Sequence, residues 1–157
     1  MKPKVYIETS IVSYLTARPS NDIRVAANQN ATIEWWDTQS QKFDLFISEL
    51  VIAEVSLGHP EAAQRQLQVI HEIQKLEATN EMRILGQEFI RKGAIPKQAE
   101  VDAYHVAIAA VNGIEYLLTW NCTHIANALM RSKIESICRL LGYEPSIICT
   151  PQELMEG

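Results

Sequence analysis

The chain has 157 residues, a length typical of one compact domain, so we expect a single domain over residues 1–157. Hydrophobic residues make up 47% of the sequence and charged residues 21%, which excludes a disordered or fibrous protein and allows a buried core. The formal net charge of −5 repels nucleic acid overall, so any polyanionic partner has to be recruited by local positive charge.

Cysteine content and hydropathy predict a soluble, cytoplasmic protein that does not contact a membrane. Cys122, Cys138 and Cys149 are odd in number and include no C-x-x-C pair, which argues against a disulfide framework and favours a reducing compartment. The apolar run before Glu8 is too short for a signal-peptide core. Residues 116–130, the longest stretch without Asp, Glu, Lys or Arg, are polar in places and shorter than the roughly 20 apolar residues that span a membrane.

The first half of the chain alternates short β-prone runs with helical patterns. Thr9-Ser10 and Ser48 follow such runs directly and are good N-caps for the helices after them, whereas Gly58 is a typical helix end. In chain order, the predicted elements are a strand at 5–7, a helix from 9–10, a helix from 21–22 to 38, a strand at 43–47 and a helix at 49–57.

The second half begins with amphipathic helices and returns to strands. The predicted elements are helices at 59–73 and 79–93, a very apolar helix at 96–113, a strand at 116–119, helices at 124–130 and 133–141, a strand at 146–149, and a capped tail at 150–151. Strands separated by helices of this length predict an α/β fold with a mainly parallel sheet and helices on both faces. Ligands of such sheets lie beyond the carboxyl ends of the strands.

Three carboxylates are placed where an unpaired charge is expensive. Glu8 directly follows the first strand, and Glu54 and Asp102 lie on helices among apolar residues; Asn121 follows the strand at 116–119. Oxygen ligands of this kind suit Mg²⁺ or Mn²⁺, and the chemistry they favour is metal-assisted phosphodiester hydrolysis. Each acid also has a local alternative: Glu8 with the positive end of the next helix, Glu54 with a Lys or Arg, and Asp102 with a hydroxyl.

Four segments resemble the PIN domains, including the VapC-like toxins of bacterial toxin–antitoxin pairs, over nearly the whole chain. They are Val5-Tyr6-Ile7-Glu8-Thr9-Ser10, Ser48 to Val55 with Glu54, Asp102 to Ala109, and Leu117-Leu118-Thr119-Trp120-Asn121. The resemblance implies a three-layer PIN-like fold and a Mg²⁺- or Mn²⁺-dependent ribonuclease that cuts single-stranded RNA. It also implies a catalytic and metal-binding cluster at Glu8, Glu54, Asp102 and Asn121, a partner antitoxin and a homodimer.

The sequence departs from the PIN pattern at two positions, with Glu8 and Asn121 where Asp is usual. Glu8 keeps the charge and reaches farther, whereas Asn121 keeps an oxygen and loses the charge, so the cluster carries about −3 rather than −4. We therefore expect one tightly bound metal. The alternative is a catalytically degenerate PIN-like module that binds RNA or a protein partner.

Several further residues are candidates for substrate contacts. Thr9 and Ser10, at a helix start, are expected to donate hydrogen bonds to phosphate or to the carboxylates. Trp120 is a candidate for base stacking. Backbone contacts to RNA are expected from a group of basic residues that comprises Arg18, Arg24, Lys42, Arg131 and Lys133. His105 shares a helical face with Asp102, so it is either a second ligand of the same ion or a histidine satisfied within the core.

Overall fold

The chain forms a five-stranded parallel sheet of order β3-β2-β1-β4-β5 in a computed structural model that describes residues 1–155. The strands are β1 (Lys4–Ile7), β2 (Asp44–Ser48), β3 (Gln74–Leu76), β4 (Tyr116–Leu118) and β5 (Ile147–Cys149). The central strand β1 is apolar, and Val5, Tyr6 and Ile7 are all completely buried. This is the pattern of a parallel strand that is covered by helices on both faces.

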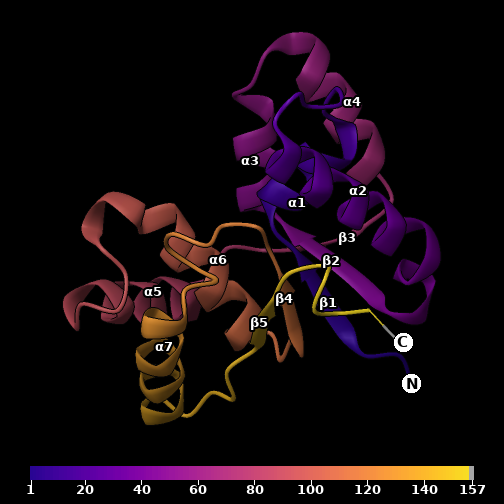
Figure 1. The fold of residues 1–157 in the computed structure, drawn as a ribbon. Coiled ribbons are helices and arrows are strands. Elements are labelled where there is room, and N and C mark those ends of the chain that lie inside the picture. Colours follow the sequence, from indigo (N-terminus) through magenta and orange to yellow (C-terminus); the bar gives the residue numbers. More distant parts are fainter. Residues whose placement is uncertain (156–157) are drawn as a thin grey trace.

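Helices cover both faces of the sheet and give three layers (Figure 1). On one side lie α1 (Thr9–Thr16), α2 (Ile23–Thr38), α3 (Glu49–Ser56) and α4 (Pro60–Ile70), and on the other lie α5 (Asn80–Arg91), α6 (Glu100–Val111) and α7 (Ala128–Leu140). Short 3₁₀ turns occupy Ser40–Lys42 and Lys97–Ala99. The predicted α/β class with a central parallel sheet flanked by helices is confirmed.

The two helix layers follow from the direction in which the chain crosses the sheet. From β1 the chain moves outward to β2 and β3, and it then returns to the other side of β1 to add β4 and β5. Because such crossovers are right-handed, reversing the direction places the later helices on the opposite face. The reversal makes a topological switch point between β1 and β4, and in open α/β sheets ligands bind beyond the carboxyl ends of the strands at that point.

Helices α5 and α6 approach each other closely at a glycine. A Cβ atom added at Gly86 of α5 would lie 2.4 Å from Cδ1 of Tyr104 on α6. Tyr104 is fixed from the other end, since its hydroxyl oxygen lies 2.6 Å from the Gln87 amide nitrogen that donates to it. The small residue therefore sets the position of α6, the helix that carries Asp102 and His105. Within residues 1–155, no helix is both long and apolar enough to cross a membrane.

Three predicted elements differ from the structure. Gln74–Leu76, for which no element was predicted, is the edge strand β3, which pairs with β2 from Phe46 to Ser48, and the helix predicted at 59–73 ends at Ile70. The helix predicted at 124–130 is wrong for its first residues, which form turns, and its remainder belongs to α7 because the Asn127 side chain caps that helix through Leu129 N. The helix predicted at 96–113 begins with a 3₁₀ turn, and its α-helical part begins at Glu100.

Candidate metal centre

Glu8 lies at the switch point, directly after β1, and its side chain is buried. Its backbone N–H donates to the Leu118 carbonyl at 3.2 Å, which extends the β1–β4 pairing by one step. Its Oε1 atom accepts two hydroxyl hydrogen bonds, from Ser10 Oγ at 2.5 Å and from Thr119 Oγ1 at 2.6 Å. Thr119 is the residue that follows β4, so the carboxylate is held from both strands of the switch point.

Glu54 reaches the same place from α3, which begins after Ser48 as its N-cap. Its Oε1 atom accepts hydrogen bonds from Thr9 Oγ1 at 2.7 Å and from His105 Nε2 at 2.5 Å. Burial raises the pKa of the Glu54 carboxyl, but the hydrogen bonds from His105 and Thr9 outweigh this effect and lower it. Glu54 is therefore ionised at neutral pH.

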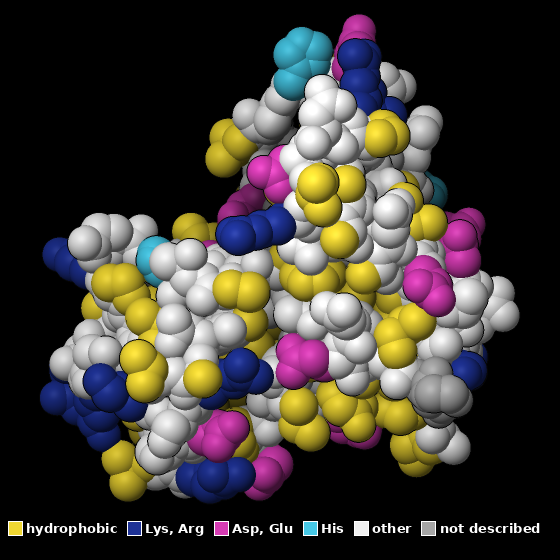
Figure 2. All heavy atoms as spheres, in the orientation of Figure 1, with side chains coloured by type: hydrophobic (Ala, Val, Ile, Leu, Met, Phe, Trp, Pro, Cys, Tyr) yellow, Lys and Arg dark blue, Asp and Glu magenta, His cyan; other side chains and the backbone are white. Residues whose placement is uncertain are grey.

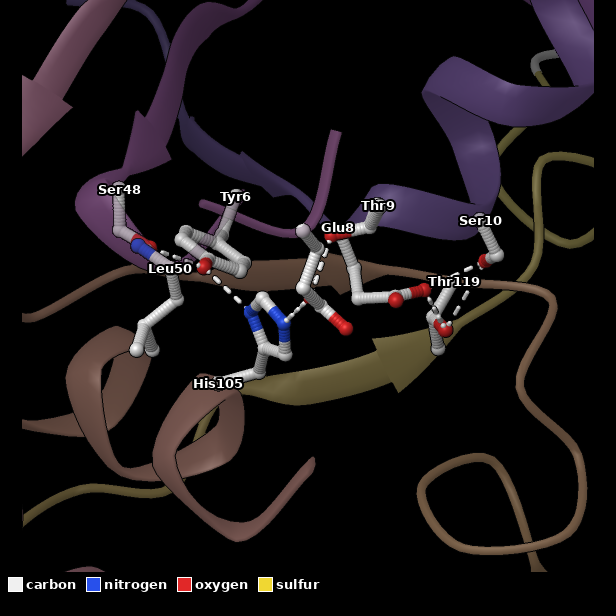
Figure 3. Close-up of polar contacts among 9 residues, drawn as sticks. Tyr6, Glu8, Thr9, Ser10, Ser48, Leu50, His105 and Thr119 are labelled. Carbon is white, nitrogen blue, oxygen red and sulfur yellow. Dashed lines mark hydrogen bonds and ion pairs between the residues drawn. The ribbon is translucent and has the colours of Figure 1, made fainter. Parts of the chain in front are cut away.

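Glu8, Glu54 and His105 form a compact group, in which one ligand atom from each lies within 4.8 Å of the others. Both carboxylates use the same oxygen, Oε1, for their two hydrogen bonds, and among residues 1–155 neither Oε2 atom has a hydrogen-bond partner. The close-up of these contacts shows Glu8 beside Thr9, Ser10 and Thr119, with the His105 ring on its other side (Figure 3). Two carboxylates with free oxygens this close together fit a hard divalent cation.

Asp102 lies in the first turn of α6 and is not a member of this compact group. Its side chain is 21% exposed, and its Oδ2 atom lies 3.6 Å from Nδ1 of His124. The carboxylate thus faces the segment after β4, where the predicted ligand Asn121 also lies. Its role as a ligand or as a base stays a prediction.

Asn121 holds the turn after β4 through both its side chain and its backbone. Its Oδ1 atom accepts a hydrogen bond from His124 N at 3.1 Å, and its carbonyl accepts from Ala126 N at 2.7 Å. Its own N–H donates to Thr119 Oγ1 at 2.9 Å. The amide oxygen that was predicted as a metal ligand is therefore already an acceptor within the loop, and its role as a ligand stays a prediction.

Thr9 and Ser10 donate their hydroxyl groups to carboxylates, one of the two functions expected for them. Thr9 donates to Glu54, and Ser10 donates to Glu8. Ser10 Oγ also accepts a hydrogen bond from Trp120 N at 2.8 Å, so it joins α1 to the segment after β4. These two residues build the centre and leave their hydroxyl hydrogens committed to it.

The other candidate substrate residues differ in their contacts and exposure. Trp120 is half-buried, its Nε1 donates to Thr32 Oγ1 at 2.7 Å, and its ring lies 6.0 Å from that of Tyr14. Arg18 and Arg24 are exposed. On the face drawn in Figure 2, Lys and Arg side chains gather mainly over the part of the molecule that contains α5 and α7. Several of these cations are paired with carboxylates: Arg91 and Lys92 lie beside Glu88, and Arg139 lies beside Glu135 and Glu144.

Three side chains that join the centre were not predicted to do so: His105 as a partner of Glu54, and Tyr6 and Ser48 behind it. Tyr6 Oη lies 2.6 Å from His105 Nδ1 and 2.7 Å from Ser48 Oγ, and all three side chains are buried. The available signal was a polar residue within the apolar run of α6, together with a tyrosine within a buried strand. Such residues need hydrogen-bond partners, but the sequence does not say which ones.

Comparison with solved structures shows the PIN-domain fold of VapC toxins over most of the chain. VapC20 of Mycobacterium tuberculosis, a sarcin–ricin-loop-cleaving toxin, matches with a TM-score of 0.56 at 16% identity, covering 76% of this chain and 91% of its own. VapBC2 of Rickettsia felis bound to a promoter DNA fragment matches with a TM-score of 0.59 at 15% identity, covering 94% and 98%. VapBC-1 of nontypeable Haemophilus influenzae matches with a TM-score of 0.57 at 12% identity, covering 95% of this chain and 98% of its own. No protein-family model and no curated protein matches the chain.

Proposed function

We propose that this chain is a metal-dependent endoribonuclease that cleaves phosphodiester bonds of single-stranded RNA, as the toxin of a toxin–antitoxin pair. The observation that carries the proposal is the pair of carboxylates, Glu8 and Glu54, brought within 4.8 Å of each other's ligand atoms at the switch point of the sheet. Each keeps one oxygen without a partner among residues 1–155. The fold shared with VapC20, a sarcin–ricin-loop-cleaving toxin, supports the same reaction class.

The residues present fit Mg²⁺ or Mn²⁺. Glu8 and Glu54 would hold the cation through their Oε2 atoms, and Asp102 and Asn121 would complete the site. When bound, such a cation neutralises charge on a phosphoryl oxygen and lowers the pKa of a water molecule.

The side chains of the centre have separable roles in this proposal. Glu54, whose pKa is lowered, stays ionised and is suited to binding and to orienting water rather than to storing a proton. Asp102, whose Oδ2 atom lies 3.6 Å from Nδ1 of His124, would take a proton from the attacking water. Trp120 and the exposed Arg18 and Arg24 would contact the RNA strand.

The test is cleavage of a fluorescent single-stranded RNA by the purified protein with Mn²⁺ or with EDTA. We expect cleavage with Mn²⁺ alone, and a loss of at least ~100-fold in Glu54→Gln and Asp102→Asn. Matched controls are Glu34→Gln and Asp37→Asn on the exposed face of α2, which should cleave at the wild-type rate. Cleavage that persists in EDTA and at the wild-type rate in both site variants contradicts the proposal. RNA binding without cleavage supports the degenerate module instead, an alternative favoured by the loop contact of the Asn121 oxygen.

The same proposal includes a cognate antitoxin, a homodimer and a cytoplasmic location. The fold that this chain shares with VapBC2 and VapBC-1 supports this part of the proposal. Light scattering of the isolated protein should give the mass of a dimer. The product of a neighbouring gene should co-purify with the chain, and its binding should abolish RNA cleavage. A monomer that cuts RNA equally well with that product bound contradicts this part of the proposal.

A further inference from the structure

A buried chain of hydrogen bonds runs from the core to the metal centre. It passes from Ser48, at the end of β2, through Tyr6 of β1 and His105 of α6 to the Glu54 carboxylate, with successive distances of 2.7, 2.6 and 2.5 Å. Tyr6, Ser48 and His105 are each 0% exposed. In Figure 3 the His105 ring lies with one nitrogen toward the Tyr6 hydroxyl and the other toward the carboxylates of the centre.

The contacts of Ser48, at the buried end of the chain of hydrogen bonds, determine which group donates in each of them. Leu50 N–H donates to Ser48 Oγ at 3.1 Å, so the Ser48 hydroxyl hydrogen must find an acceptor elsewhere. Within residues 1–155, the acceptor it has is Tyr6 Oη. Tyr6 therefore donates its own hydrogen to His105 Nδ1.

The same direction decides which nitrogen of His105 carries a hydrogen. Since Nδ1 is an acceptor, the hydrogen of the neutral ring is on Nε2, where it is donated to Glu54. A metal ion bound directly to Nε2 would require the hydrogen to move to Nδ1. Tyr6 would then have to donate to Ser48, and the buried Ser48 hydroxyl hydrogen would lose its acceptor.

We propose that His105 is a positioning residue and not a metal ligand: the Ser48–Tyr6–His105 chain holds Oε1 of Glu54 and so directs Oε2 toward the cation. This inference rests on the proposed function, because it assumes that Glu54 binds the metal. Hydrogen bonds that orient a ligating carboxylate typically matter ~10–100-fold in metal affinity. An all-oxygen site also keeps the preference for Mg²⁺ and Mn²⁺ that a nitrogen ligand would shift toward zinc.

The test combines Mn²⁺ titration by calorimetry with the tautomer of His105 by long-range ¹H–¹⁵N NMR of the metal-free protein. In NMR we expect the Nε2–H tautomer, assigned among the four histidines by the signals missing from His105→Gln. In calorimetry we expect His105→Leu to bind Mn²⁺ ~10–100-fold more weakly and Tyr6→Phe to weaken binding in the same direction. His105→Gln should restore most of the affinity, because its amide can accept from Tyr6 and donate to Glu54.

Controls and contrary outcomes separate this inference from the proposed function. Tyr143→Phe and His71→Gln lie away from the centre and should bind Mn²⁺ as the wild type does. If His105→Leu does not fold, as judged by circular dichroism, Tyr6→Phe still decides the outcome, since it removes one hydroxyl only. An Nδ1–H tautomer, or wild-type affinity in both Tyr6→Phe and His105→Leu, overturns the inference and leaves the nuclease proposal standing. Absence of Mn²⁺ binding by the wild type, or unchanged binding in Glu54→Gln, overturns both.

Discussion

Thr119→Val should lower the free energy of unfolding of the metal-free protein by about 3 kcal/mol. The substitution keeps the shape of a completely buried side chain but removes the hydroxyl that donates to Glu8 at 2.6 Å and accepts from Asn121 N at 2.9 Å. A hydrogen bond to a charged group contributes about 1.5–3 kcal/mol, and a neutral one about 1 kcal/mol. Glu8 retains Ser10 as a donor, so we expect a loss no larger than these two contributions added together.

Urea denaturation in EDTA, followed by circular dichroism, measures this loss. Thr16→Val is a matched control, because the half-buried Thr16 hydroxyl donates only to carbonyls of its own helix, those of Val12 and Ser13. We expect the control to change stability by less than about 0.5 kcal/mol. A loss below about 1 kcal/mol in Thr119→Val, or one equal to that of the control, would refute the view that Glu8 depends on this hydroxyl.

Three further predictions concern the centre and its support. Asn121→Asp should strengthen Mn²⁺ binding in calorimetry, because it restores a negative charge, whereas two equally tight sites in the wild type would contradict the expected single tight one. Gly86→Ala should lower the free energy of unfolding by about 1 kcal/mol, since the clash with Tyr104 outweighs the gain in helix propensity; unchanged stability in urea would refute it. Because the pKa of Glu54 is lowered by folding, its stabilising effect is complete above the ordinary value of about 4.3 and lost as the pH falls below it. Metal-free Glu54→Gln should therefore lose less stability than the wild type between about pH 5 and 3.5 in urea unfolding.

Local sequence signals were sufficient for most of the fold. The strand before Glu8, the helix after Ser48 and the apolar helix of His105 were predicted from their patterns, and the structure has an element at each. The Ser48 side chain caps its helix as predicted, whereas Thr9 and Ser10 lie inside α1, whose N-cap is Glu8. Strand β3 could not be predicted in this way. Gln74–Leu76 is a three-residue strand with no β-branched side chain, so its conformation depends on pairing with β2, which is a contact distant in sequence.

The centre was predictable in part. Glu8 could be placed at the sheet edge because it directly follows a strand. Glu54 could be placed on the helix that follows the second strand, among apolar residues. The structure brings the two carboxylates together. The orientation of His105 could not be read from the sequence. Its spacing from Asp102 allowed either a shared ion or a histidine satisfied within the core, and in the structure the ring contacts Glu54, 51 residues earlier in the chain.

The centre joins residues that are synthesised far apart in time. Glu8 depends on a hydroxyl 111 residues later, and Glu54 on an imidazole 51 residues later. A nascent chain that has not yet extended beyond β4 carries both acids but lacks Thr119, so its carboxylates are not held together. In the proposed ribonuclease, the centre would therefore be complete only after the chain through Thr119 has left the ribosome.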